Sequence, residues 1–68
     1  MKVINRNVSL LGSESFVTYE YDSGHKFRQW YCGHVFGYTP KGNFTSQVTL
    51  HKLARIASEF EDRRLQTN

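Results

Sequence analysis

The sequence has little of what usually reinforces a very small domain. It holds one cysteine among 68 residues, Cys32, so no disulfide can form within the chain. Without cysteines nearby, a structural zinc site is not expected, and a lone thiol is typical of a reducing compartment. A chain of this length buries only about 60% of the surface that it exposes when unfolded. We therefore expect one small domain over residues 1–68, held together by a modest hydrophobic core.

Long hydrophobic runs and blocks of one charge are also missing. No segment approaches the roughly 20 apolar residues that span a bilayer, and the first residues lack the apolar core of a signal peptide. The sequence therefore predicts a soluble, cytoplasmic protein without membrane contact. The net charge is +3, and residues 1–52 carry six of the nine Lys and Arg but no basic run. Such an excess allows a nucleic-acid partner without requiring one.

Residue types that carry catalysis are present without the spacing that catalysis or metal binding requires. Cys32 and His34 flank a glycine, His25 follows a turn, and His51 begins the expected helix. A metal site needs three or four converging ligands, and a thiol nucleophile needs a placed base and an orienting group. We predict that the protein is not an enzyme and uses no metal and no cofactor.

Alternating and β-branched residues predict an α+β fold. A three-stranded antiparallel sheet is expected in β-β-β-α order, with one C-terminal helix packed on one face. The strands are predicted at about residues 2–10, 15–21 and 25–36, the helix at about 49–64, and a frayed tail at 65–68.

The expected helix has one apolar stripe, formed by Leu50, Leu53, Ile56, Ala57 and Phe60. Val48 lies off that stripe, so the helix is predicted to begin near Thr49 as the N-cap residue, with Ser46 as the alternative. Residues 44–48 fit either a short strand or the lead-in to the helix.

The segment Tyr21–His25 predicts the turn of a β-hairpin. A three-residue loop over residues 22–24 is preferred, because its last residue is a glycine, which adopts a left-handed conformation at least cost. This loop sets the following residues opposite one another: Phe16 and Trp30, Thr18 and Arg28, Tyr19 and Phe27, Glu20 and Lys26. A two-residue Ser-Gly loop is the alternative, and it would move Lys26 and Arg28 onto the apolar face.

The preferred register divides the side chains between two faces. The expected core face holds Val17, Tyr19, Tyr21, Phe27, Tyr31 and Val35. The opposite face holds Phe16, Thr18, Glu20, Lys26, Arg28, Trp30, Cys32, His34 and Phe36. A bulge at Gly33 would swap the last three of these. Because unpaired Lys, Arg and Glu are costly in a dry core, the second face is expected to be exposed.

The candidate partner-binding residues are Phe16, Lys26, Arg28, Trp30 and His34, which we call the aromatic-basic face. Trp and Arg dominate protein interfaces, and a small non-catalytic protein is predicted that modulates or inhibits another protein or protein complex, of the kind that phages and mobile elements encode. The alternative is a small DNA- or RNA-binding regulator, because aromatic rings also stack bases beside cations. The competing explanation is that a loop or terminal segment covers these rings, or that a homodimer forms through the sheet face or edge.

Overall fold

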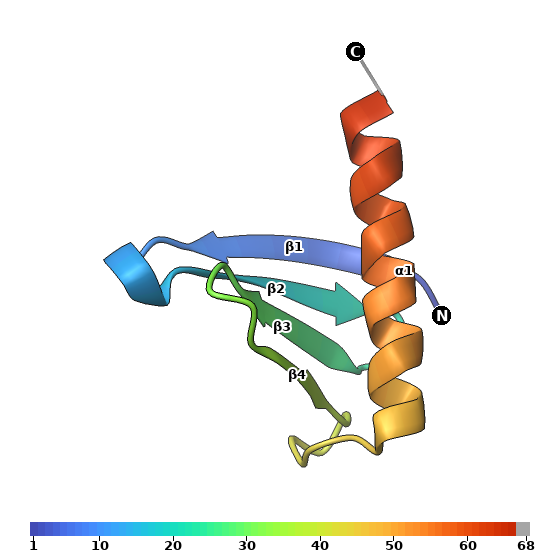
Figure 1. Cartoon of the computed structure of the whole chain (residues 1–68). Coiled ribbons are helices and arrows are strands. Elements are labelled where there is room, and N and C mark those ends of the chain that lie inside the picture. The colour runs from blue at the N-terminus through green and yellow to red at the C-terminus, as the bar shows by residue number, and fades with distance from the viewer. Residues whose placement is uncertain (67–68) are drawn as a thin grey trace.

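The computed structural model describes residues 1–66 as a four-stranded sheet with one long helix on it. The element order is β1 (Val3–Ser9), η1 (Gly12–Glu14, a 3₁₀ helix), β2 (Phe16–Tyr21), β3 (Lys26–Trp30), β4 (Val35–Tyr38) and α1 (Gln47–Gln66). The strands are antiparallel and neighbours in chain order, and α1 lies against one face of the sheet (Figure 1). The α+β class and the C-terminal helix are confirmed, whereas the prediction of three strands is wrong.

The predicted strand over residues 25–36 is two strands, β3 and β4, joined by a tight turn. The Trp30 N–H donates a hydrogen bond to the His34 carbonyl at 2.9 Å, and the Gly33 N–H donates one to the Trp30 carbonyl at 3.0 Å. Gly33 has a φ of +110°, a conformation that residues with a Cβ rarely adopt. Gly33, considered as a site where a bulge would swap the faces, instead ends the loop of a second hairpin, and Phe36 stays opposite Arg28.

Three loops that connect neighbouring extended segments have the same length and the same type of last residue. Each has three residues and ends in a glycine with positive φ, at Gly24, Gly33 and Gly42. In the first loop the Tyr21 N–H donates to the His25 carbonyl at 3.0 Å, which confirms the predicted three-residue loop. Because all three loops have the same length, side chains keep their face from strand to strand and form rows across the sheet.

The register of the first hairpin is the predicted one. Phe16 lies opposite Trp30, and Glu20 lies opposite Lys26. The next pair of strands continues the same rows, since β4 sets Phe36 opposite Arg28 and places Tyr38 opposite Lys26. The sheet therefore has one face toward α1, called the inner face, and one face away from it, called the outer face.

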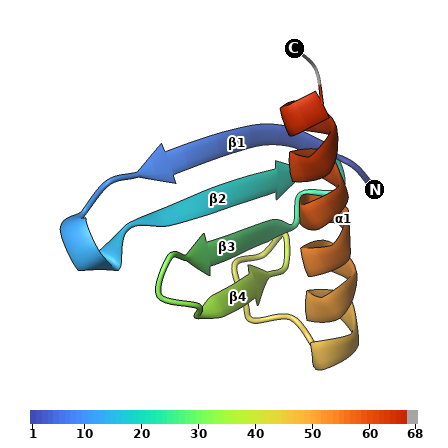
Figure 2. The ribbon, with the colours of Figure 1, turned by 45° about the horizontal axis from the view of Figure 1, so that its top comes forward.

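The core lies between the inner face and α1. Its buried residues are Val17, Tyr19, Tyr21, Phe27, Leu53 and Ala57, with Leu50, Ile56 and Phe60 partly buried against them. The predicted helix stripe is thus confirmed. Tyr31 and Val35 were also expected in the core, but they are 64% and 37% exposed. Figures 1 and 2 give the reason, because α1 crosses only one end of the sheet and leaves the turn between β3 and β4 uncovered.

The helix begins two residues earlier than predicted. The Thr49 N–H donates to Ser46 Oγ at 3.3 Å, and the Leu50 N–H donates to the Ser46 carbonyl at 2.9 Å. Ser46, the alternative in the sequence analysis, is therefore the N-cap residue. Val48 lies in the first turn but is 81% exposed, which explains why the apolar stripe does not include it.

The C-terminal half of α1 is tied to the sheet through Glu61. Its carboxylate accepts hydrogen bonds from Arg6 Nε, from the Tyr19 hydroxyl at 2.7 Å and from Arg64 Nε at 3.1 Å. Burial alone would raise the pKa of Glu61, but these hydrogen bonds outweigh it and lower that pKa below its ordinary value. The helix continues to Gln66, so residues 65 and 66 of the predicted frayed tail are helical, whereas 67 and 68 lie outside the described residues.

Gly37 allows α1 to approach β4 closely. A Cβ on Gly37 would lie 2.6 Å from Thr45 Oγ1 and 3.1 Å from Leu50 Cδ1. We expect Gly37→Ala to lower the free energy of unfolding by about 1–3 kcal/mol, because the neighbouring segments must shift. Urea denaturation of Gly37→Ala in the parent and in a Thr45→Ala background measures the effect. Removing the nearest atom should recover part of the loss, and a Gly37→Ala protein as stable as the parent would contradict this packing.

Candidate functional site

The aromatic-basic face lies on the outer side of the sheet, away from α1. Phe16 comes from β2, whereas Lys26, Arg28 and Trp30 come from β3. The rings of Phe16 and Trp30 are opposite each other with centroids 5.1 Å apart. His34 is exposed in the turn before β4 and lines a surface hollow together with Phe16 and Trp30. The prediction that these side chains gather on one side of the sheet is confirmed, and their role in binding stays a prediction.

Three further aromatic residues extend this surface across β4. Trp30 contacts Phe36 edge-on at 5.5 Å, Phe36 contacts Phe44 at 5.7 Å, and Phe44 contacts Tyr38 at 5.6 Å between ring centroids. We call Phe16, Trp30, Phe36, Tyr38 and Phe44 the ring cluster. The sequence analysis placed Phe36 on this face but did not identify Tyr38 or Phe44, because both follow the hairpin that it did not recognise.

Arg28 lies at the centre of the ring cluster. Its guanidinium carbon is 4.6 Å from the centroid of the Phe16 ring, 5.7 Å from that of Trp30 and 5.8 Å from that of Tyr38. Arg28 Nε also donates a hydrogen bond to Thr18 Oγ1 at 3.2 Å. Cation–π contacts and this hydrogen bond hold the guanidinium in place. A positive charge is therefore presented within a frame of aromatic rings before any partner arrives.

The outer face is not covered by the described part of the chain. Within residues 1–66 the long helix packs on the inner face, and the segment that follows β4 runs alongside this strand through a bridge between Tyr38 and Phe44. Phe36 and Phe44 are 40% and 71% exposed. These values leave the aromatic surface accessible to a partner, while Phe16, Arg28 and Trp30 are partly buried by their own neighbours.

Arg6 lies apart from the two basic residues of the aromatic-basic face. Lys26 and Arg28 are on the outer face, where Glu20 lies opposite Lys26. Arg6 is bound to Glu61 on the side of α1. A phosphate backbone is bound most strongly where several cations line one track, and this distribution lacks that arrangement among the residues just named.

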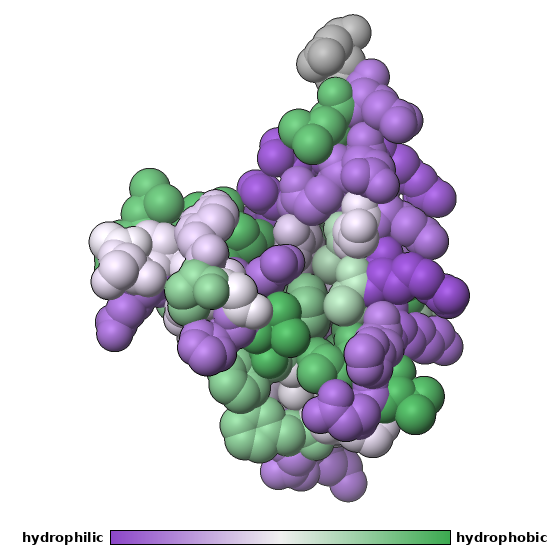
Figure 3. Space-filling model, viewed as in Figure 1, coloured by the Kyte–Doolittle hydropathy of each residue, from purple (hydrophilic) through white to green (hydrophobic). Residues whose placement is uncertain are grey.

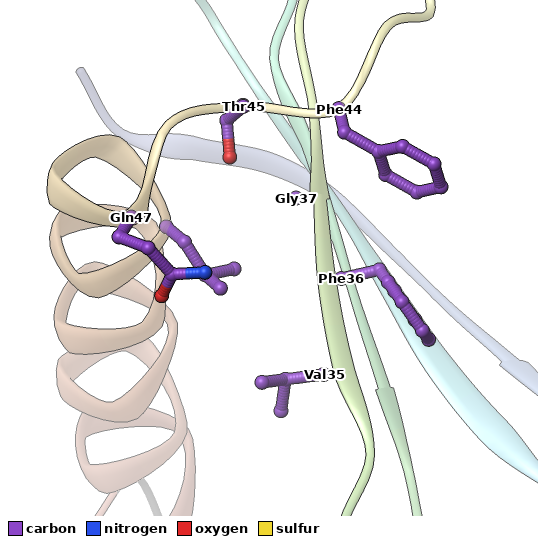
Figure 4. Close-up of a pocket in the computed structure, with 7 residues that line it drawn as sticks. Val35, Phe36, Gly37, Phe44, Thr45 and Gln47 are labelled. Atoms are coloured by element: carbon purple, nitrogen blue, oxygen red, sulfur yellow. The ribbon is translucent and has the colours of Figure 1, made fainter.

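A pocket of about 240 Å³ adjoins the ring cluster between β4 and the first turns of α1 (Figure 4). Its lining residues are Val35, Phe36, Gly37, Phe44, Thr45, Gln47 and Leu50. Figure 4 shows Val35 on the helix side of the strand, with Phe36 and Phe44 on the other side. Figure 3 shows hydrophobic side chains gathered between β4 and the start of α1, whereas most of the outward side of α1 is hydrophilic.

Cys32 and His34 line one surface hollow, whereas His25 follows the first hairpin loop and His51 lies on α1. Cys32 is exposed in the loop between β3 and β4, and His51 is exposed on α1. His25 Nδ1 lies 2.8 Å from Ser23 Oγ beside the first hairpin loop. Within residues 1–66, no three His, Cys, Asp or Glu side chains are grouped so as to hold a metal ion. Over the same residues, no helix combines the length and apolar character needed to cross a membrane.

Comparison of this chain with protein-family models, with curated proteins and with solved structures finds no match. A proposal about function therefore depends on the geometry of the outer face and of the pocket beside it.

Proposed function

We propose that this chain is a non-catalytic binding protein, which modulates or inhibits another protein by contacting it through the aromatic-basic face and the ring cluster. The observation that carries the proposal is the stacking of Arg28 among aromatic rings on a face that α1 leaves uncovered. Trp, Tyr and Arg are enriched among the few residues that dominate interface energies. Because these side chains already pack on one another, they lose little conformational freedom when a partner binds.

A protein partner is favoured over nucleic acid by the arrangement of rings and charges. The rings of the cluster pack on one another in tilted and edge-on contacts, from 31° to 86° between planes, so each ring turns part of its surface toward a neighbouring ring. Bases stack best on rings whose flat faces are open. The cations are also divided, since Arg6 is bound to Glu61 on the opposite side from Arg28.

The test is capture of a partner from a cell lysate treated with nuclease, followed by affinity measurements on the purified partner. Trp30→Ala should weaken binding by about 2 kcal/mol or more, and Arg28→Ala should weaken it by less. The matched control is Arg55→Ala, which removes an exposed arginine from α1. Melting curves of every variant establish that it is folded. If the loss of ring contacts destabilises Trp30→Ala, the affinity of Arg28→Ala decides the test.

Other outcomes would assign the face differently. Loss of the captured partner on nuclease treatment, with affinity falling log-linearly and steeply with salt, would indicate nucleic acid. A dimer of the parent that dissociates in Trp30→Ala, seen by analytical ultracentrifugation, would indicate that a second copy occupies the face. Equal weakening by Arg55→Ala and Arg28→Ala would refute the assignment of the site.

A further inference from the structure

β4 is an edge strand, and its outer edge is covered over only part of its length. Residues 43–45 run antiparallel beside the end of β4, where the Thr45 N–H donates to the Gly37 carbonyl at 3.0 Å. The chain then turns into α1, so this pairing stops. Within residues 1–66, no strand lies beside the start of β4 at Val35 on that side.

The backbone of Val35 points toward this open side. In an antiparallel ladder, successive residues direct their N–H and C=O groups to alternate sides. His34 directs its carbonyl to β3, because it accepts the Trp30 N–H. Gly37 directs its carbonyl outward, because it accepts the Thr45 N–H. Val35 is two residues before Gly37 in the same strand, so its backbone groups point to the same side. The N–H and C=O of Val35 are therefore presented at the open edge.

The pocket lies directly beside this edge. A residue paired with Val35 from outside would direct its side chain to the helix side of the sheet, which is the side of the pocket that Val35, Gln47 and Leu50 line (Figure 4). Its two neighbours would point to the outer face, next to Phe36 and the rest of the ring cluster. Thr45 also lines the pocket, and its buried Oγ1 has no hydrogen-bond partner among the described residues.

The opposite edge of the sheet is protected against strand addition. The pairing of β1 with β2 is interrupted by a register shift between Val3 and Asn5. Arg6 on the same strand points a charged side chain to the inner face, where it binds Glu61. Irregular pairing and inward charges are the usual means of preventing another strand from pairing with an edge. The start of β4 is regular and carries an apolar pocket, so the two edges differ in kind.

We propose that β4 accepts an extended segment of the partner protein as an additional antiparallel strand, with an aliphatic side chain seated in the pocket. This inference rests on the proposed function, because it specifies how the protein that contacts the ring cluster is recognised. Strand addition supplies main-chain hydrogen bonds for affinity and uses alternate side-chain sites for specificity. The pocket selects an apolar residue, and the ring cluster selects apolar or aromatic neighbours on either side of it.

A library of random linear peptides, selected against the full chain, tests the proposal without knowledge of the natural partner. Selected peptides should share an aliphatic residue with an apolar or aromatic residue on either side of it. Binding should slow hydrogen exchange at the Val35 amide. N-methylation of the peptide residue that faces Val35 should weaken binding at least about tenfold, because it removes a main-chain hydrogen bond and adds a clash.

Val35→Pro is the matched change in the protein. It removes the outward N–H, and a proline is tolerated in an edge strand where that group faces solvent. Val35→Thr keeps the N–H and serves as the control, so Val35→Pro should lose more affinity than Val35→Thr. If Val35→Pro does not fold, the N-methylated peptide and the exchange of the Val35 amide in the parent decide.

Three results would overturn strand addition: no enriched peptide, full binding to a folded Val35→Pro protein, or an unchanged Val35 amide on binding. Trp30→Ala separates this inference from the proposed function. Weaker binding in Trp30→Ala with full binding in Val35→Pro refutes strand addition and keeps the ring cluster as the contact surface. Full binding in Trp30→Ala with weaker binding in Val35→Pro supports strand addition and refutes the aromatic-basic face as the contact surface.

Discussion

Leu53→Ala should leave much of the protein unfolded at temperatures where the parent is folded. Leu53 is completely buried, with 0% of its surface exposed, at the centre of the core that α1 forms with the sheet. Truncation of a buried leucine costs about 2–5 kcal/mol, because the cavity that remains is only partly refilled. Small domains are stable by about 5–15 kcal/mol in total, and a 68-residue chain is expected near the low end.

Leu65→Ala is the matched control for this prediction. It makes the same substitution in the same helix, but Leu65 is 66% exposed. Its effect should stay within about 0.5 kcal/mol, as for most surface substitutions. Thermal melting and urea denaturation of both variants measure the difference. Similar losses in the two proteins would mean that α1 does not pack on the sheet through Leu53.

Raising the pH above about 10 should destabilise the fold through two buried tyrosines. The Tyr21 hydroxyl donates to the Leu53 carbonyl at 2.6 Å, and the Tyr19 hydroxyl donates to Glu61. Burial raises the pKa of Tyr21 well above its ordinary value. Burial, followed by the hydrogen bond to Glu61, raises the pKa of Tyr19 to about 12. Both tyrosines therefore keep their proton in the folded state at pH values where the unfolded chain loses it.

The direction of the effect follows from these raised pKa values. Each tyrosine contributes its full stability below the unfolded pKa of 10.0, and loses it progressively as the pH rises through the folded pKa. Between the unfolded pKa and the raised folded pKa of each tyrosine, the free energy of unfolding should fall by up to about 1.4 kcal/mol per pH unit for that tyrosine. An alkaline transition of several kcal/mol is therefore expected, enough to unfold a marginal domain.

Tyr21→Phe isolates one of the two groups. At neutral pH the variant should lose about 1 kcal/mol, because a buried hydrogen bond to the Leu53 carbonyl is removed. Above about pH 10, its free energy of unfolding should fall roughly half as steeply as that of the parent. Urea denaturation of the variant and the parent across the alkaline range compares the two slopes. Equal slopes would show that Tyr21 does not titrate differently in the folded and unfolded states.

Local sequence determined the first hairpin and the side of the sheet on which most candidate residues lie. A glycine at the end of a three-residue loop and opposite charges at Glu20 and Lys26 are signals between near neighbours in the chain. They were enough to predict the pairing of Phe16 with Trp30 and the exposure of that face. The apolar stripe of α1 was predicted for the same reason, because helical periodicity is local.

The second hairpin was missed because the alternation of side chains continues through it. Tyr31 and Val35 maintain an apolar pattern on both sides of Gly33, so the segment reads as one strand. The available signal was the even spacing of Gly24, Gly33 and Gly42, which repeats the same loop at equal intervals along the chain. Recognising that spacing would also have placed Tyr38 on the outer face.

Only the tertiary structure determined how the surface is completed. Phe44 reaches the ring cluster because its segment returns along β4, and Glu61 meets Arg6 and Tyr19 because α1 crosses the sheet. Val35 is left at an open edge because the chain leaves β4 to begin α1. Each of these features joins residues that are far apart in sequence or depends on where a neighbouring segment ends. Residue patterns specify which face a side chain takes, whereas the path of the folded chain decides which faces and edges stay uncovered.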